Sequence, residues 1–451
     1  MPGVEAGHLA RLATYPFVLI SWVDDAGYPV SVATAFAVDQ AAGTVSLTAP
    51  AGDAVAVPTD REVNVLGSHI RPTPGQGYDE RRYLQLWGRA AAVVSGRIAF
   101  TPAQAWGWDE AEIPFFEYSE RSVPQSRRYL AQLSEEQGRT VRPRLSLGWL
   151  LLRTTRLPFL SATLVPVLLG IAVAARHGDF NWWLALVTIL GASFAHLGIN
   201  VSNDIFDTLS GADEANVNPT QFSGGSRVLI YDLLTLRQLV ALDLGLFGGA
   251  AAIGLYLVWA TASQTLLLIG VAGIVLGIAY TAPPVKLVYR GLGEIAVAIG
   301  FGPIMVLGAY AVQTGSLSWE ASVASLPVAI LVALILYVNE IPDRVGDAAA
   351  GKRTLPVRLS ADVVTGIYLI LALAAFVAVG AGVAGGLLPI PALLALAAIP
   401  LVFRVHRGIR QNYGSPYALM GPMGVNIRIH LYVGGLLLVG YLIAIIVAAF
   451  T

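Results

Sequence analysis

An acidic cluster in the second apolar stretch is the clearest sign of chemistry in this sequence. Asn200, Asn203, Asp204 and Asp207 are spaced i, i+3, i+4 and i+7, which places all four on one face of a helix. Asp213 follows in the loop beyond them. Acidic groups at membrane depth are costly and usually functional. A single such cluster could also consist of Asp and Asn side chains that only cap a helix end.

A second cluster repeats the arrangement farther along the chain. Asn339, Asp343 and Asp347 recur every four residues, and Pro342 is expected to disturb the helix between them. Two matched clusters of oxygen groups suit Mg²⁺, which prefers a few carboxylates together with water and substrate phosphate oxygens. The predicted metal ligands are Asp204, Asp207, Asp213, Asp343 and Asp347.

Basic and phenolic side chains accompany both clusters. A metal neutralises part of a diphosphate, and Lys or Arg can neutralise the rest as charge builds on a leaving group. Any one of these basic residues could instead be an ordinary loop residue at a membrane surface. The predicted substrate-binding residues are Asn200, Asn203, Arg227, Tyr280, Lys286, Asn339, Arg344 and Lys352.

The composition indicates which kind of element must hold these groups. Of 451 residues, 55% are hydrophobic and only 13% are charged, whereas a soluble domain is about 25% charged. Most of the chain must therefore present apolar surface to lipid. The sequence has no Cys, which excludes thiol catalysis, disulfides and zinc–thiolate sites. A net charge of −1 argues against nucleic-acid binding.

Charge is distributed unevenly along the chain. Residues 1–144 contain 13 Arg, no Lys and 16 Asp or Glu, whereas residues 145–451 contain 15 Lys or Arg and 13 Asp or Glu. We therefore predict a soluble domain over residues 1–144 and a membrane domain over residues 145–451. The N-terminus has no apolar run and is not expected to be a signal peptide.

The first domain is predicted to be β-rich. Short alternating segments are separated by turns such as Asp24-Asp25-Ala26-Gly27, a pattern typical of a small barrel. A helix is expected to begin at Thr101 with Pro102 in its first position, and another is expected over about residues 124–137. The predicted strands cover residues 18–23, 30–38, 44–48, 62–66, 83–94 and 97–100.

The second domain is predicted to be an all-α transmembrane bundle of nine helices, since a spanning helix needs about 20 mainly apolar residues. The predicted spans cover about residues 155–174, 182–202, 237–259, 264–281, 292–312, 321–339, 363–384, 386–403 and 431–450.

Basic residues predict the orientation of this bundle. Alternate connections hold twelve Lys or Arg, and the connections on the opposite side hold only Arg176. Since basic loops stay in the cytoplasm, we predict a multi-pass protein of the cytoplasmic membrane with the N-terminal domain cytoplasmic and the C-terminus on the far side. The twelve residues are Arg227, Arg237, Lys286, Arg290, Arg344, Lys352, Arg353, Arg358, Arg404, Arg407, Arg410 and Arg428.

Four motifs over about residues 145–451 resemble those of UbiA-type intramembrane prenyltransferases. They are Asn203 to Asp207, Asp343 to Asp347, Tyr280 to Lys286, and Gly293-Glu294. The resemblance implies Mg²⁺-dependent transfer of a polyprenyl chain from an allylic diphosphate to an aromatic acceptor. It assigns the catalytic roles to Asp204, Asp207, Asp343 and Asp347.

Two further segments suggest the acceptor. Residues 216–229 and 156–170 look most like the 1,4-dihydroxy-2-naphthoate polyprenyltransferase branch of the family, which makes menaquinone precursors. The resemblance therefore implies 1,4-dihydroxy-2-naphthoate or a related quinone precursor as the acceptor.

The first domain resembles the flavin-binding split-barrel family that includes pyridoxamine 5′-phosphate oxidase. The resemblance covers about residues 10–140 and rests on the Asp24–Gly27 turn between two strands and on the segment Leu86–Ala91. It implies either a bound FMN or deazaflavin, or a scaffolding barrel that could form a dimer. The alternative functions are a flavin-linked membrane oxidoreductase, a redox-regulated prenyltransferase acting on another lipid acceptor, and a transporter with acidic residues in its path.

Overall fold

The computed structural model describes residues 4–50, 56–73, 77–142, 145–216, 219–220 and 222–450. It divides into two compact units, Met1–Arg121 and Ser122–Thr451. The domain boundary predicted between residues 144 and 145 falls inside the second unit, and residue 144 lies outside the described residues.

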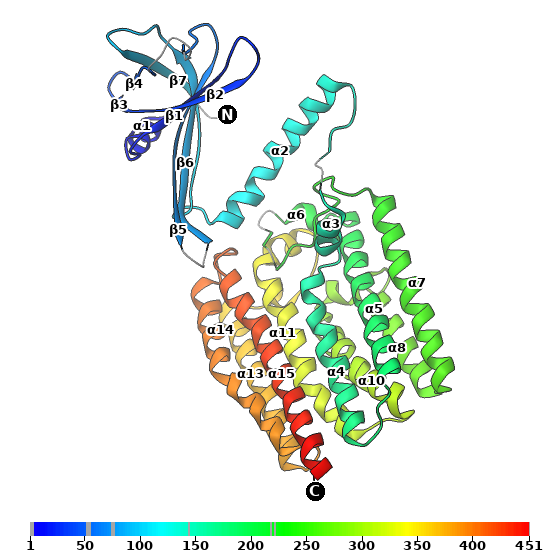
Figure 1. The fold of residues 1–451 in the computed structure, drawn as a ribbon. Helices are drawn as coiled ribbons and strands as arrows, with labels where there is room; N and C mark the ends of the chain where they lie inside the picture. The colour runs from blue at the N-terminus through cyan, green and yellow to red at the C-terminus, as the bar shows by residue number, and fades with distance from the viewer. Residues whose placement is uncertain are drawn as a thin grey trace. The chain divides into compact units, whose positions relative to one another are not determined.

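Seven antiparallel strands form the sheet of the first unit, a half-barrel that confirms the predicted β-rich architecture (Figure 1). Their order is β2-β1-β5-β6-β7-β4-β3. Alternate side chains face one core, in which Ile20, Leu47, Leu86 and Phe100 are fully buried. The elements are α1 (Ala6–Leu12), β1 (Val18–Val23), β2 (Pro29–Thr34), β3 (Phe36–Asp39), β4 (Thr44–Thr48), β5 (Val63–Thr73), β6 (Gly77–Ala90) and β7 (Arg97–Asp109).

The helix predicted to begin at Thr101 is wrong, because β7 continues to Asp109. Thr101 and Pro102 had suggested an N-cap and a first helical position. In the structure Pro102 lies opposite Gly88, at a register shift in the pairing of β6 with β7. A β-bulge tolerates proline because no ladder hydrogen bond is required there.

Helix α2 (Phe115–Gln137) begins earlier than the helix expected over residues 124–137. Its first turns belong to the first unit, where Tyr118 stacks on Trp108 with ring centroids 4.8 Å apart. The Tyr118 and Tyr83 hydroxyl groups are 2.5 Å apart. Aromatic packing that involves the start of α2 could not be read from local sequence spacing.

The second unit is a helical bundle (Figure 1). Within the residues that the structure describes, nine segments are long and apolar enough to cross a membrane, as predicted. The longer elements are α3 (Leu147–Thr154), α4 (Ser161–Arg176), α5 (Trp182–Leu209), α7 (Leu236–Thr261), α8 (Gln264–Thr281), α9 (Gly293–Ile299), α10 (Met305–Thr314), α11 (Trp319–Ala349), α13 (Ala361–Ala384), α14 (Ile399–Asn412) and α15 (Met420–Phe450). The shorter elements are η1 (Leu157–Leu160), α6 (Ala212–Ala215), η2 (Leu287–Arg290), η3 (Gly300–Ile304), α12 (Leu355–Arg358) and η4 (Ile390–Ala398).

Helix α11 is the most deeply buried span. It packs against α4, α9, α13 and α15, and Tyr337 and Val338 on it are almost completely buried. Helices α7 and α8 instead expose most of their apolar surface, as lipid-facing helices do. The second acidic cluster therefore lies on the most buried of the spans.

Both cluster-bearing helices extend beyond their predicted apolar spans. The prediction ended these spans at residues 202 and 339, but α5 continues to Leu209 and α11 to Ala349. Hydropathy falls where the side chains become polar, whereas backbone hydrogen bonds continue the helix. Pro342 does not end α11, although a proline inside a helix removes one hydrogen bond. Asn339, Asp343 and Asp347 therefore stay on one continuous helix.

Candidate functional site

Asp204 on α5 accepts hydrogen bonds from a side chain and from the backbone. The side chain is only 2% exposed. Arg156 donates a hydrogen bond from Nη2 to Oδ1 of Asp204 at 3.0 Å, and the backbone N–H of Ser226 donates to both carboxylate oxygens at 3.1 Å. These contacts fix the orientation of the carboxylate.

Asp207 lies one helical turn farther along α5 and has more partners. The Tyr289 hydroxyl donates to Oδ1 at 3.0 Å, and Nζ of Lys352 lies 2.9 Å from the same oxygen. The Asn203 side chain donates to Oδ2 at 3.1 Å. Asn200, also predicted to bind substrate, donates to the carbonyl oxygen of Thr155 at 3.0 Å. In this structure both asparagines stabilise the surroundings of the aspartates.

The loop between α6 and α7 connects the first cluster with the second. The side chain of Asn216 donates to Oδ1 of Asp343 at 2.8 Å, and the backbone N–H of Gly224 donates to Oδ2 at 3.0 Å. The predicted motif over residues 216–229 thus contacts both clusters, although residues 217, 218 and 221 lie outside the described residues.

Gly225 allows this loop to approach the aspartates closely. Its φ of +72° lies in the left-handed region, and a Cβ at this position would come within 3.0 Å of Oδ1 of Asp213 and 3.1 Å of Oδ1 of Asp204. A larger residue would be strained by its backbone conformation and would press on two carboxylates. The glycine therefore has a direct role in the shape of the site.

Arg227 stabilises the same loop through hydrogen bonds to its backbone. Its Nη1 donates to the carbonyl oxygens of Asp213 and Asn216 at 2.9 and 3.0 Å. The Asp213 carboxylate accepts a hydrogen bond from the Thr208 hydroxyl at 3.2 Å. Burial, together with the nearby charges of Asp207 and Asp204, raises the pKa of Asp213 to about 7.

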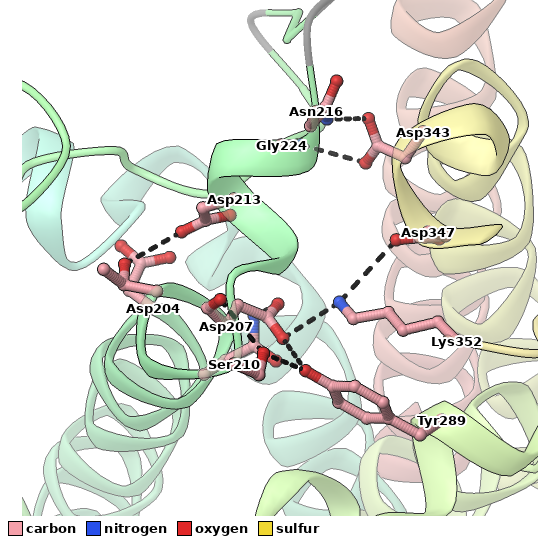
Figure 2. Close-up of polar contacts among 12 residues, drawn as sticks. Asp204, Asp207, Ser210, Asp213, Asn216, Gly224, Tyr289, Asp343, Asp347 and Lys352 are labelled. Atoms are coloured by element: carbon pink, nitrogen blue, oxygen red, sulfur yellow. Dashed lines mark hydrogen bonds and ion pairs between the residues drawn. The ribbon is translucent and has the colours of Figure 1, made fainter. Parts of the chain in front are cut away.

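Lys352 connects the two acidic clusters. Its Nζ lies 2.9 Å from Oδ1 of Asp207 and 3.7 Å from Oδ1 of Asp347 (Figure 2). Burial opposes its charge, but Asp207 and Asp347 outweigh burial and raise the pKa of Lys352. Burial and Asp207 together raise the pKa of Tyr289 to about 12. A buried ammonium group thus lies between carboxylates of two helices.

These residues fit Mg²⁺ when it binds together with a diphosphate. Among the described residues, no three acidic or histidine side chains converge closely enough to hold a metal ion by themselves. Mg²⁺ commonly uses only one or two carboxylates and takes its other ligands from water and phosphate oxygens. The position of the Lys352 ammonium shows that Asp207 and Asp347 together attract a cation.

The remaining predicted residues have different surroundings. Arg344 donates from Nη1 to the carbonyl oxygen of Ile341 at 2.8 Å, and its guanidinium lies over the Tyr413 ring. Lys286 lies over the Tyr289 ring, with Nζ 4.8 Å from the centroid. Tyr280, at the end of α8, interacts electrostatically with Lys352 and Asp207. Asn339 is half-buried on α11.

A basic rim borders the site. Tyr289, Arg290, Arg353 and Arg358 line a half-open depression of about 220 Å³. Since Tyr289 also contacts Asp207, the depression lies directly beside the acidic clusters. Three guanidinium groups around one depression suit an anion such as a phosphate.

Sequence reasoning did not identify Arg156, Ser226 or Tyr289 as site residues. Arg156 was visible only as the first residue of the segment 156–170, and its contact with Asp204 joins positions 48 residues apart. Ser226 contributes its backbone N–H, and a backbone donor cannot be predicted from the type of side chain. Tyr289 lies three residues beyond the predicted motif Tyr280 to Lys286, and this proximity was the one available signal.

Comparison with known proteins gives consistent results. The UbiA prenyltransferase family matches residues 163–427. The chain is 30% identical over 286 residues to the 2-carboxy-1,4-naphthoquinone phytyltransferase of Synechocystis sp., covering 63% of this chain and 90% of that protein. It is 28% identical over 314 residues to the 1,4-dihydroxy-2-naphthoate octaprenyltransferase of Bacillus subtilis, covering 69% and 98%. A solved structure of a UbiA homolog from Archaeoglobus fulgidus bound to GPP and Mg²⁺ is 12% identical, with a TM-score of 0.46 over 64% of this chain and 99% of that one.

Proposed function

Because the chain belongs to the UbiA prenyltransferase family and is a prenyltransferase, we propose that it transfers a polyprenyl chain from an allylic diphosphate to 1,4-dihydroxy-2-naphthoate or a related quinone precursor. One structural observation carries the proposal: aspartates of α5 and α11 face each other across the ammonium group of Lys352. The names of the two curated relatives support a naphthoate as the acceptor.

We assign the donor diphosphate to the region between the two acidic clusters. Asp204, Asp207, Asp343 and Asp347 would hold Mg²⁺, with Asp213 as a further ligand. When bound, Mg²⁺ stabilises the negative charge that develops on the departing diphosphate. Lys352 would supply a fixed positive charge beside the diphosphate oxygens. The arginines of the basic rim would supply further positive charge next to the diphosphate. The apolar spans provide an environment for the prenyl chain.

The protein is a multi-pass membrane protein, and we propose that the acidic clusters lie at its cytoplasmic face. The twelve basic residues of the predicted cytoplasmic connections support this orientation. The first unit would then also be cytoplasmic, and the C-terminal end of α15 would lie on the far side.

We also propose that the first unit binds a flavin through its phosphate. The buried atoms Arg11 Nε and Arg82 Nε have no well-formed hydrogen bond among the described residues, and guanidinium groups suit a phosphate. A bound phosphate would compete with Asp109 and Glu112, which lie 3.8 and 3.9 Å from the Arg11 guanidinium. Absorption by oxidised flavin in the purified full-length protein, lost in Arg82→Met, would support this role. A colourless protein that binds neither added FMN nor a deazaflavin would contradict it. Dimerisation through the barrel remains a prediction.

The prenyl-transfer proposal is tested with full-length protein in detergent. Mg²⁺, geranylgeranyl diphosphate and 1,4-dihydroxy-2-naphthoate are supplied, with other aromatic acceptors in parallel, and products are followed by mass spectrometry. A prenylated naphthoate that requires Mg²⁺ and disappears with EDTA is expected. Donor binding without product from any naphthoate would overturn the acceptor assignment.

A further inference from the structure

A pair of glutamates lies beside the second acidic cluster and is not among the proposed metal ligands. Glu340 lies on α11, three residues before Asp343, and is only 5% exposed. Glu294 lies in the first turn of α9. The two carboxyl groups are close enough to interact directly. They come from different spans, so the fold has brought them together.

Apart from their interaction with each other, three of the four oxygen atoms of this pair lack a partner. Both oxygens of Glu340 and Oε1 of Glu294 are buried and have no well-formed hydrogen bond among the described residues. A buried carboxyl group without a partner is costly, especially inside a membrane domain. Asp207 and Asp343, by contrast, accept hydrogen bonds from named donors on neighbouring elements. Beyond the interaction between the two glutamates, the pair therefore presents hydrogen-bond acceptors for which the described residues supply no donor.

The pair is adjacent to the proposed reaction centre. Glu340 interacts electrostatically with Asp347 and Lys352, and Tyr280 of α8 interacts with both glutamates. Three residues of helix advance about 4.5 Å, so Glu340 lies roughly one turn deeper in the bundle than Asp343. The pair therefore lies on the apolar, interior side of Asp343, where the prenyl chain would also extend.

We propose that Glu294 and Glu340 form the binding site for the hydroxyl groups of the aromatic acceptor. This inference rests on the proposed prenyl transfer. Two carboxyl groups in low dielectric avoid carrying two charges by sharing a proton, which leaves oxygen atoms free to accept hydrogen bonds from O–H groups. A hydrogen bond accepted from the acceptor hydroxyl orients the ring and increases its electron density at carbon. The pair would thus select a hydroxyaromatic acceptor.

The test uses full-length protein in detergent as wild type, Glu340→Gln and Glu294→Gln. Glu214→Gln is the matched control, because Glu214 is exposed on the short helix α6. The measurements are the acceptor KM and kcat with 1,4-dihydroxy-2-naphthoate, the affinity for geranylgeranyl diphosphate with Mg²⁺, and direct binding of the acceptor followed by tryptophan fluorescence. A methyl ether of the same acceptor, which lacks the O–H donors, is compared throughout.

Each glutamate variant is expected to raise the acceptor KM about ten- to hundredfold, the usual effect of a lost hydrogen bond to a charged group. Donor affinity should stay within about twofold of wild type, and the control should match wild type throughout. Wild type should discriminate strongly against the methyl ether, and the variants should discriminate much less. These results separate acceptor binding from a general structural role.

Three results would overturn the inference. The first is an unchanged acceptor KM in both variants. The second is an equal loss of donor and acceptor affinity, which would indicate a structural pair. The third is equal use of the methyl ether by wild type. If wild type forms no prenylated naphthoate, the proposed function itself fails, and the fluorescence measurement still reports whether the pair binds a hydroxyaromatic ring.

Discussion

Helix α11 has a buried carboxylate at each end, and the two ends differ in how that charge is balanced. At the first end, Glu320 accepts from Nη1 of Arg176 at 2.6 Å and contacts Nε2 of His177 at 2.8 Å. One carboxylate there has two basic partners. At the other end, Asp347 faces Asp207 of α5 across Lys352, and Asp343 accepts hydrogen bonds from Asn216 and Gly224.

This difference separates a structural ion pair from a site that needs a ligand. Glu320 is paired with the guanidinium of Arg176 and also contacts the His177 ring, so these contacts join the end of α4 to α11 without a ligand. The acidic end has Arg156 and Lys352 as the cations in its ion pairs among the described residues, against five aspartates. The aspartates of this end therefore outnumber the cations paired with them, and Mg²⁺ bound with a diphosphate would balance the excess negative charge.

The largest expected effect comes from removing one charge at the acidic end. Asp343→Asn keeps the size of the side chain and one acceptor oxygen for Asn216 or Gly224, so the protein should stay folded. Product formation should fall at least about a hundredfold, because a metal ligand supplies several kcal/mol to the transition state. The assay is prenylated product by mass spectrometry, with Asp204→Asn expected to behave in the same way.

The matched control is Asp362→Asn, the same change at an exposed position in the first turn of α13. It should leave turnover unchanged. Turnover at the wild-type rate in Asp343→Asn would remove the metal-clamp interpretation and the comparison that depends on it.

Lys352→Met changes the cation of the acidic end without touching a carboxylate. Because Lys352 competes with Mg²⁺ for Asp207 and Asp347, the half-saturating Mg²⁺ concentration should fall. The donor KM should rise about tenfold or more, because a positive charge beside the diphosphate is lost. Titrations of Mg²⁺ and of donor measure these opposite shifts, and Arg404→Met on the exposed face of α14 is the control. Parallel shifts of both constants would contradict this role.

Glu320→Gln should affect stability and leave chemistry intact. The change leaves Arg176 and His177 without a negative partner, and on the order of 1–2 kcal/mol should be lost, since both bases are partly exposed. A lower Tm in detergent, with wild-type turnover per folded molecule, is the expected result. If turnover fell while Tm stayed constant, the two ends of α11 would not differ in the way described.

The sequence predicted the positions of the aspartates better than the contacts that hold them. Helical spacing placed Asp204, Asp207, Asp343 and Asp347 at the edges of two spans, because a face of a helix is a local property. The contact of Arg156 with Asp204 and the contacts of Arg227 with two carbonyl oxygens depend on how distant segments meet, and no local pattern contains that information. Strand β7 shows the same limit, since the bulge opposite Pro102 requires the partner strand.

The smallest expected effect concerns the acidic end and pH. Asp213 has a pKa raised to about 7, so below pH 7 its carboxyl group is mostly protonated and must lose that proton before it can bind a cation. The half-saturating Mg²⁺ concentration should therefore fall as pH rises from 6 to about 7 and level off above it, by less than tenfold per pH unit. In Asp213→Asn, the half-saturating Mg²⁺ concentration should depend less steeply on pH, and any remaining dependence should still be a fall with rising pH. Mg²⁺ titrations at a series of pH values measure it, and an unchanged slope in Asp213→Asn would show that another group carries the proton. A flattened slope would show that a proton on Asp213 reduces the excess negative charge of the acidic end until Mg²⁺ binds. The Glu320 end, where Arg176 already pairs with the carboxylate, is not expected to show this behaviour.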